Sequence, residues 1–324
     1  MARYFRSDLG RNAGVSTEIT GYAVSTLLFL HERVGGSNYL DAALRAARFL
    51  TRTAWDAKLA TFPFELADGP GFAYFFDCGI IVRGLLAMWR ATGDAEFCDV
   101  AVAAGRGMLA DFGAGGAIHP ILALPEKRAL AYETNWSRSP GCYQLKSALA
   151  WQELFALTGE REFQCGYEGV LAAALANHGG FLDAEPDPLR KMDRLHAYGY
   201  FLEGLAPVLD RPECAEAFRS GVYRMARLLH EIEPAFVRSD VYAQLLRARI
   251  LGDARGVLRL DESAASHEAE QAHSFQLPSG GFAFGRKNGE MMPFVNPVST
   301  AFCVQALAMW NDRSTQLGSQ CDVI

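Results

Sequence analysis

Six apolar segments recur along the chain, each long enough to form a helix and each with few polar positions. They recur at intervals of roughly 40 to 65 residues, a spacing that is typical of helical repeat proteins. The segments begin near Gly21, Gly79, Tyr143, Gly199, Val241 and Val298. Because they are apolar nearly all round, we expect these six helices to be buried.

A short polar turn and a second helical pattern follow most of these segments. The turns lie at 34–38, 92–96, 158–162 and 210–213. Glycine in such a turn ends one helix, and Ser, Asn or Asp caps the next. In the first repeat Leu40, Ala43, Leu44, Ala47 and Leu50 form one apolar stripe. The second helices are therefore amphipathic, and we expect them on the outside.

The fifth repeat departs from this pattern, because only the polar segment 260–272 can supply its outer helix. Longer connections, several with Gly and aromatic residues, follow the outer helices. They lie at 58–65, 114–120, 178–188 and 279–290. Alternating fragments such as FAFG predict short strands in these connections.

Inner helix, tight turn, outer helix and long loop, repeated six times, predict an all-α fold. We expect a single domain, 1–324, built as an (α/α)6 toroid of six helical hairpins. The alternative is an open α-solenoid of stacked hairpins. The closed ring is favoured because six hairpins close this architecture and neither terminal repeat looks like a polar cap. In such a ring the N-termini of the inner helices share the long-loop face.

Composition narrows the class of protein. Half of the 324 residues are apolar and 21% are charged, which is ordinary for a globular protein. The net charge of −6 argues against a nucleic-acid partner. The first residues lack the apolar stretch of a signal peptide, and no run of 18 apolar residues exists, so we expect no membrane association. We expect the protein in the cytoplasm.

The cysteines give no sign of a metal or another cofactor. Their number is odd, and neither a CxxC motif nor an adjacent Cys-His pair occurs, so we expect reduced and mostly buried thiols without zinc. They are Cys78, Cys98, Cys142, Cys165, Cys214, Cys303 and Cys321. The last four residues, from Cys321, formally fit a prenylation box. Chance is the better explanation, because the composition looks bacterial.

Several segments resemble the six-hairpin glycosidase-like superfamily, in particular its less well characterised bacterial members linked to polysaccharide metabolism. They are VSTEITGYAVSTLL, FFDCGIIVRGLLAMWRATGD, HAYGYFLEGL and VNPVSTAFCVQAL. The resemblance covers the whole chain at the level of the repeat, and it implies an enzyme of carbohydrate metabolism. The superfamily includes glycoside hydrolases, unsaturated-uronide hydrolases, polysaccharide lyases and sugar epimerases. No catalytic signature of one of these classes transfers residue by residue.

The candidate catalytic residues lie just before, or at the start of, the predicted inner helices. They are Glu18, Asp77, His196, Tyr198 and Asp240. Paired carboxylates perform glycosidic chemistry, and His or Tyr can move a proton in epimerase or lyase reactions. If the ring closes, these side chains face one cavity on the long-loop side. The alternative is structural, with the acids at or near helix N-caps and the histidine as a satisfied core group.

The candidate substrate-binding residues come from the same positions in the repeats. They are Tyr74, Asn135, Trp136, Arg138, Arg238 and Asn296. Aromatic rings stack on sugars, and arginine can hold a carboxylate in bidentate fashion. The alternative for the arginines, Arg194 included, is ion pairing with Glu133, Asp193 or Asp240 on the surface. The alternative for Asn296 is an N-cap before Pro297.

The sequence therefore points to an enzyme acting on a glycan or oligosaccharide, with hydrolysis the first choice and epimerase or lyase chemistry next. Two other classes stay open. One is a non-catalytic carbohydrate-binding or scaffold protein of a polysaccharide pathway. The other is a terpene-like cyclase that uses the toroid cavity, although the Asp-rich DxDD motif of such cyclases is missing from the sequence.

Overall fold

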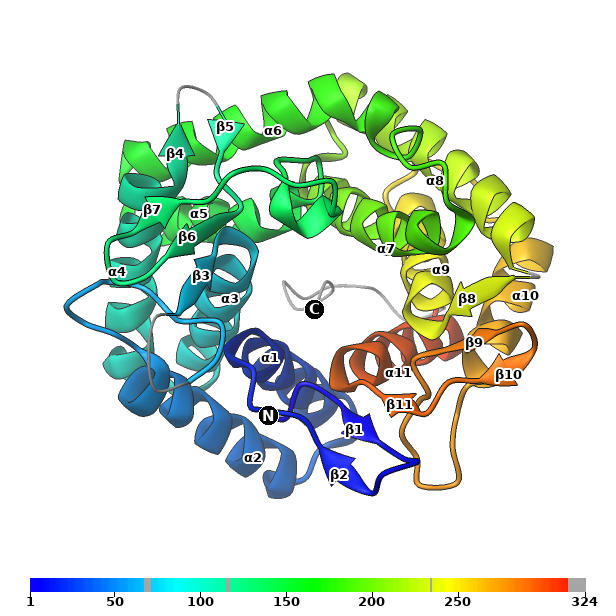
Figure 1. Cartoon of the computed structure of the whole chain (residues 1–324), viewed down its shortest axis with the longest axis horizontal. Coiled ribbons are helices and arrows are strands. Elements are labelled where there is room, and N and C mark those ends of the chain that lie inside the picture. The colour runs from blue at the N-terminus through cyan, green and yellow to red at the C-terminus, as the bar shows by residue number, and fades with distance from the viewer. Residues whose placement is uncertain (67–70, 115–116, 234, 314–324) are drawn as a thin grey trace. The chain divides into compact units, whose positions relative to one another are not determined.

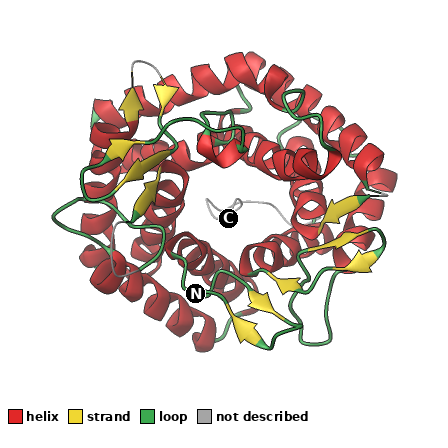
Figure 2. Cartoon of the chain, viewed as in Figure 1, coloured by secondary structure: helices red, strands yellow, loops and turns green. Residues whose placement is uncertain are grey.

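The computed structural model describes residues 1–66, 71–114, 117–233 and 235–313. Helices dominate this part of the chain, and the strands are short (Figures 1 and 2). The α-helices are α1 (Thr17–Val34), α2 (Ser37–Phe49), α3 (Phe75–Thr92), α4 (Ala95–Phe112), α5 (Gln144–Thr158), α6 (Arg161–Phe181), α7 (Pro188–Leu205), α8 (Pro212–Ile232), α9 (Ser239–Ala254), α10 (Glu262–His273) and α11 (Pro297–Asn311). The 3-10 turns are η2 (Trp136–Arg138) and η3 (Ala206–Val208), and α2 continues into a π turn, η1 (Leu50–Ala54).

The odd-numbered helices are the six apolar segments of the sequence. Five of them begin within a few residues of the predicted positions, which confirms the repeat. The fourth prediction was wrong, because α7 begins at Pro188 and not near Gly199. Asp187 caps its N-terminus by accepting a hydrogen bond from the Leu189 N–H, and Pro188 fits the first helical position. His196 and Tyr198 consequently lie in the middle of α7.

The even-numbered helices are the amphipathic outer ones. In α2 only Ala43 and Ala47 are buried, whereas most of α9 is buried. The polar segment of the fifth repeat does form a helix, α10, as predicted. The connection predicted at 178–188 is shorter than expected, because α6 continues to Phe181.

The chain divides into two compact units. Unit 1 comprises Met1–Arg3 and Gly14–Ala174, and unit 2 comprises Tyr4–Ala13 and Leu175–Ile324. In unit 1, α3 packs against α1, α4 and α5. In unit 2, α9 packs against α7, α8, α10 and α11. Each unit is therefore built around one central inner helix.

Glycines let the inner helices of unit 1 approach closely. A Cβ on Gly79 of α3 would lie 2.0 Å from Ser147 Oγ of α5. A Cβ on Gly84 of α3 would lie 2.8 Å from the Gly21 carbonyl oxygen of α1. The Ser147 hydroxyl donates to the carbonyl oxygens of Phe75 and Phe76, which fastens α5 to the first turn of α3.

Short strands lie in the long connections, as the alternating fragments predicted. They are β1 (Phe5–Arg6), β2 (Arg11–Asn12), β3 (Phe72–Tyr74), β4 (Gly113–Ala114), β5 (Ala117–Ile118), β6 (Ile121–Ala123), β7 (Arg128–Ala129), β8 (Phe236–Arg238), β9 (Gly285–Lys287), β10 (Glu290–Met291) and β11 (Phe294–Val295). Antiparallel pairing joins them in the orders β3-β6-β7, β4-β5, β10-β9-β8 and β11-β1-β2. Strands β3 and β8 lead directly into α3 and α9 and so fix where these helices begin.

The six cysteines in the described ranges are free thiols. Four of them are buried, Cys98 is partly exposed and Cys165 is exposed. Cys321 lies outside the described residues. Among the helices described, none is long and apolar enough to cross a membrane.

The close approach of α3 and α5 can be tested with Gly79→Ala. The added methyl group has no room beside Ser147, so we expect a loss of about 1–3 kcal/mol in the free energy of unfolding. Gly169→Ala, on an exposed face of α6 with open space around it, is the matched control. There the better helix propensity of alanine should add up to about 1 kcal/mol. Urea unfolding of both variants measures the difference, and equal effects would contradict this packing.

Candidate active site

Two acidic residues of unit 1 lie in the first turns of inner helices, Glu18 in α1 and Asp77 in α3. Neither is an N-cap. Ser16 caps α1 by accepting from the Ile19 N–H, and Asp77 lies three residues beyond Tyr74, the N-cap of α3. Glu18 lies in the first turn of α1, two residues beyond the N-cap, which fits the alternative of a helix N-terminal acid, whereas the N-cap alternative is wrong for Asp77.

The surroundings of this pair favour the protonated form. Burial raises the pKa of Glu18 to about 7, although the positive charge of Lys146 opposes the rise. Burial also raises the pKa of Asp77 well above its usual value, and the nearby charge of Glu18 adds to the rise. Asp77 is 5% exposed, and in the described part of the chain its Oδ2 has no hydrogen-bond partner. The pair thus holds a proton near neutral pH.

Lys146 of α5, which the sequence analysis missed, belongs to the same cluster. Its side chain is fully buried, and its Nζ lies 5.1 Å from the ring centroid of Tyr22 on α1. The signal in the sequence was a lysine next to the apolar run that follows Ser147 in the predicted third inner helix.

Aromatic residues and an arginine lie near the pair. Burial raises the pKa of Tyr74, the charge of Asp77 adds to the rise, and Arg138 opposes it, so both charges lie within reach of this ring. Trp136 packs edge-on against Tyr143, with ring centroids 5.0 Å apart. Arg138 forms an exposed ion pair with Glu133 at 2.6 Å, which confirms the pairing alternative for this arginine. The exposed Asn135 caps η2.

Unit 2 holds the other predicted acid, Asp240 of α9, in a different environment. The Arg238 guanidinium donates to both of its carboxylate oxygens, at 2.9 and 2.8 Å, and Ser299 donates at 2.8 Å. Burial alone would raise the pKa of Asp240, but Arg238, His196 and the hydrogen bonds lower it to about 2. Asp240 is therefore an ionised carboxylate with its oxygens occupied. It is not the N-cap of α9, which is Arg238.

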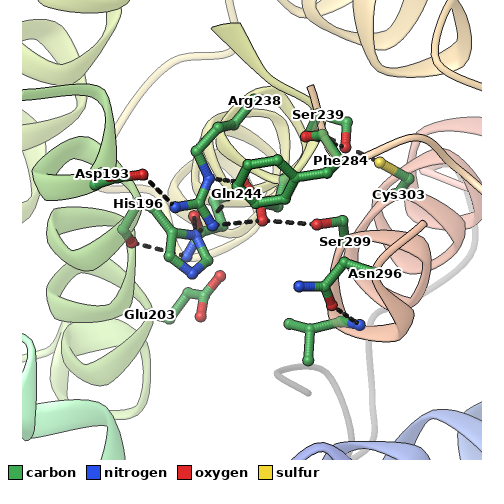
Figure 3. A network of polar contacts seen from close by, with 12 residues as sticks. Asp193, His196, Glu203, Arg238, Ser239, Gln244, Phe284, Asn296, Ser299 and Cys303 are labelled. Atoms are coloured by element: carbon green, nitrogen blue, oxygen red, sulfur yellow. Dashed lines mark hydrogen bonds and ion pairs between the residues drawn. The ribbon is translucent and has the colours of Figure 1, made fainter. Parts of the chain in front are cut away.

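Arg238 contacts two acidic side chains and one aromatic ring (Figure 3). Besides Asp240 it donates to Asp193 at 2.8 Å, and its guanidinium lies 4.5 Å from the ring centroid of Phe284. The ion-pair alternative is thus confirmed for this arginine too, although the pair with Asp240 is buried and not on the surface. Arg194 donates to the Phe181 carbonyl oxygen.

His196 of α7 is a neutral imidazole in this network. The Gln244 amide donates to the His196 carbonyl oxygen at 3.2 Å, so its Oε1 faces His196 Nδ1 at 2.9 Å and accepts the proton there. Burial and Arg238 lower the pKa of His196 to about 4, against the opposing influence of Asp240, Gln244 and Glu203. Nε2 therefore carries the lone pair.

A second buried ion pair, also missed from the sequence, lies beside His196. Arg247 of α9 bonds to Glu203 of α7 and to Gln305 of α11. Its guanidinium lies 4.2 Å from the ring centroid of Phe302. Glu203 and Arg247 are each 1% exposed, so this pair is a fixed part of the interior of unit 2.

The remaining two candidates have structural contacts. Tyr198 is two residues from His196 and points to the opposite side of α7, where its hydroxyl lies 3.0 Å from His178 Nδ1 of α6. Asn296 accepts from the Val298 N–H at 2.8 Å and caps α11, which confirms the capping alternative. In the part of the chain that the structure describes, no group of three or more His, Cys, Asp or Glu side chains could hold a metal ion.

The buried pair of Arg238 and Asp240 predicts a large difference between two conservative variants. Asp240→Asn leaves a buried guanidinium short of its counter-charge, so we expect a loss of about 3 kcal/mol in unfolding free energy. Asp193→Asn is the matched control, because Asp193 is 44% exposed and should cost less than about 1 kcal/mol. Urea unfolding measures both. The loss in Asp240→Asn should shrink as pH falls from about 4 towards 2, where the native carboxylate takes up its proton.

The raised pKa of Glu18 predicts a pH-dependent gain in Glu18→Gln. The native state binds the Glu18 proton more tightly than the unfolded chain, so stability falls as pH rises from about 4.5 through 7. Glutamine removes this ionisation. The Tm of Glu18→Gln should therefore rise relative to that of the native chain across this interval. Glu32→Gln, at an exposed position near the end of α1, is the control for replacing a surface glutamate of the same helix. A difference in Tm between Glu18→Gln and the native chain that stays constant over this interval would contradict the prediction.

Several solved structures match nearly the whole chain. A sugar epimerase from a ruminal bacterium matches with a TM-score of 0.71 at 12% identity, over 96% of this chain and 92% of that one. A cellobiose 2-epimerase from Spirochaeta thermophila matches with a TM-score of 0.67 at 14% identity, over 93% and 87%. An unsaturated glucuronyl hydrolase from Bacillus sp. GL1 matches with a TM-score of 0.63 at 14% identity, over 98% and 94%.

No protein-family model matches the chain, and no curated protein does. Structural matches at identities this low establish the fold, but they do not establish the reaction. The chain therefore has the (α/α)6 toroid fold of these structures.

Proposed function

We propose that the protein is a carbohydrate-active enzyme that hydrolyses a glycosidic bond by general acid–base catalysis at Glu18 and Asp77. The observation that carries the proposal is the pair itself. Two carboxyl groups from adjacent inner helices lie close enough for the charge of one to raise the pKa of the other, and burial keeps a proton on the pair near neutral pH. Acids with a pKa near the working pH are the most effective proton donors.

The reaction uses one carboxyl group as acid and the other as base. The Asp77 carboxyl gives its proton to the bridging oxygen, and the bond between that oxygen and the anomeric carbon breaks. Glu18 takes a proton from a water molecule as the water oxygen bonds to the anomeric carbon. The pair ends with the proton on Glu18, and exchange with solvent restores the starting state.

The acids of unit 2 suit this chemistry less well. Asp240 is ionised, and three hydrogen bonds occupy its oxygens. His196, with its pKa near 4, is a weak base at neutral pH, and its ring proton on Nδ1 is held by Gln244 Oε1. In this proposal Asp240 and Arg238 orient the interior of unit 2 and take no part in the reaction.

The residues near the pair suit a sugar ligand. Trp136 and Tyr74 are partly exposed and present aromatic rings, and the Arg138 guanidinium lies beside Tyr74. A binding or scaffold protein would need the aromatic surface but not two acids with raised pKa values. A terpene-like cyclase would need a largely apolar site. The pair therefore favours an enzyme that handles polar substrates.

Sugar epimerisation is the second candidate. The sugar epimerase and the cellobiose 2-epimerase share the fold over most of the chain. Within the described residues His196 Nε2 has no hydrogen-bond partner. An unprotonated imidazole nitrogen can remove a proton from carbon. Reactions run in D₂O and in H₂¹⁸O separate the two. Hydrolysis places ¹⁸O at the new reducing end, whereas epimerisation places deuterium on carbon and leaves the mass of the ¹⁸O sample unchanged.

The test of the proposed function compares two Asp→Asn variants on a panel of oligosaccharides that includes unsaturated uronides. Asp77→Asn should lower kcat/KM by about 10²–10⁴-fold, because the proton donor is lost. Asp94→Asn is the matched control, since Asp94 caps α4 and asparagine caps as well as aspartate. The control should keep its activity. Both variants should keep the native Tm within a few degrees.

Full activity in Asp77→Asn would remove this acid from the mechanism. Deuterium on the product carbon without a new reducing end would replace hydrolysis by epimerisation. Binding of an oligosaccharide without any turnover, measured by calorimetry, would favour the carbohydrate-binding alternative.

A further inference from the structure

Lys146 is a buried cation that the proposed reaction does not yet use. It lies on α5 between Leu145 and Ser147, inside unit 1, and none of its side chain is exposed. A buried ammonium group costs several kcal/mol unless a negative charge or an aromatic face compensates for it. Such a residue, buried in the first turn of α5, is therefore expected to have a compensating partner.

Two groups on α1 supply that compensation. The Tyr22 ring faces the ammonium group, with Nζ 5.1 Å from its centroid. Glu18 precedes Tyr22 by one helical turn, so both side chains lie on the same side of α1. The charge of Lys146 lowers the pKa of Glu18, whereas burial and the charge of Glu18 raise the pKa of Asp77.

We propose that the Lys146 ammonium, packed against the Tyr22 ring, assigns the two roles within the carboxylate pair, with Glu18 the proton acceptor and Asp77 the proton donor. This inference rests on the proposed function for its catalytic meaning. Lys146 acts through Glu18 and is a positioning residue.

The groups near the pair come from α1, α3 and α5 and from the residues that cap α3 and α5. From α1 they are Glu18 and Tyr22, and from α5 Lys146, while Tyr74 and Tyr143 are the N-caps of α3 and α5. From α3 they are Asp77 and Cys78. Burial raises the pKa of both Tyr143 and Cys78, so these two stay neutral near pH 7 and add no charge. Lys146 is consequently the positive charge that distinguishes one carboxyl group from the other.

Exposure favours the same assignment. Glu18 is partly exposed and can reach water, whereas Asp77 is 5% exposed. The carboxyl group with the cation and the solvent contact ionises more readily, because both stabilise the charged form. The more deeply buried carboxyl group keeps the proton. When their environments push the pKa values of two neighbouring carboxyl groups apart, the group with the higher pKa is the acid and the other is the base.

The first measurement uses the native chain and needs no substrate. Carboxyl ¹³C chemical shifts of the labelled protein, with Glu18→Gln and Asp77→Asn for assignment, follow each group through a pH titration. We expect Glu18 to ionise at lower pH than Asp77. If Asp77 ionises first, the proposal is overturned whether or not the protein hydrolyses a glycoside.

The second measurement removes the cation. In Lys146→Met, which keeps a similar volume, the midpoint of Glu18 should move up by about one pH unit or more, because an opposite charge within reach lowers a carboxyl pKa by roughly 1–3 units. Lys58→Met, on the exposed surface of unit 1, is the control and should leave the midpoint unchanged. An unchanged midpoint in Lys146→Met would also overturn the proposal.

Activity completes the test. The acidic limb of the kcat/KM profile should move to higher pH in Lys146→Met by the same interval as the Glu18 midpoint, with the alkaline limb less affected. If the midpoint moves but no glycoside is cleaved by the native chain, the role of Lys146 stands and the proposed hydrolysis fails. A uniform loss of activity at every pH would reduce Lys146 to a structural residue.

Discussion

The close approach of the inner helices in each unit is the constraint on which the chemistry depends. Gly79 brings the backbone of α3 against Ser147 of α5, and Gly84 brings it against the Gly21 carbonyl of α1. In unit 2, Gly199 of α7 makes the same kind of contact with Gln244 of α9. Larger residues would separate the helix starts. The influence of one carboxylate on the next, which falls with distance, would weaken.

This packing places charged groups where water cannot solvate them, and the two units respond differently. In unit 2 several buried acids have a buried arginine, as in the pairs Asp240 with Arg238 and Glu203 with Arg247. Such pairs fix geometry and contribute little net stability. In unit 1 the positive charge of Lys146 acts on Glu18, while burial and the charge of Glu18 hold the pKa of Asp77 well above its usual value, so one of the two acids keeps a proton. Incomplete neutralisation costs stability, and it is also what leaves a group reactive.

The sequence predicts the fold better than it predicts the site. Apolar periodicity and turn residues locate the helices, because these signals are local. Glu18, Asp77 and Asp240 look alike in sequence, each an acid at the start of an apolar helix. Their protonation differs because of partners that come from other helices, such as Lys146 for Glu18 and Ser299 for Asp240. The start of α7 could not be located from apolar periodicity, because the apolar pattern begins well after Asp187 and Pro188, where the helix starts.

The strand order β11-β1-β2 has a consequence for synthesis on the ribosome. Phe5 pairs with Val295, and Arg6 pairs with Phe294, so one of the first segments made is completed by one of the last. Until residues 294 and 295 leave the exit tunnel, one edge of β1 is an open strand edge, and such edges readily pair with other chains. Unit 2 therefore completes this sheet only after the helices α1 to α5 of unit 1 have emerged. A ribosome that stalls before this point would release a chain prone to association through its N-terminal hairpin.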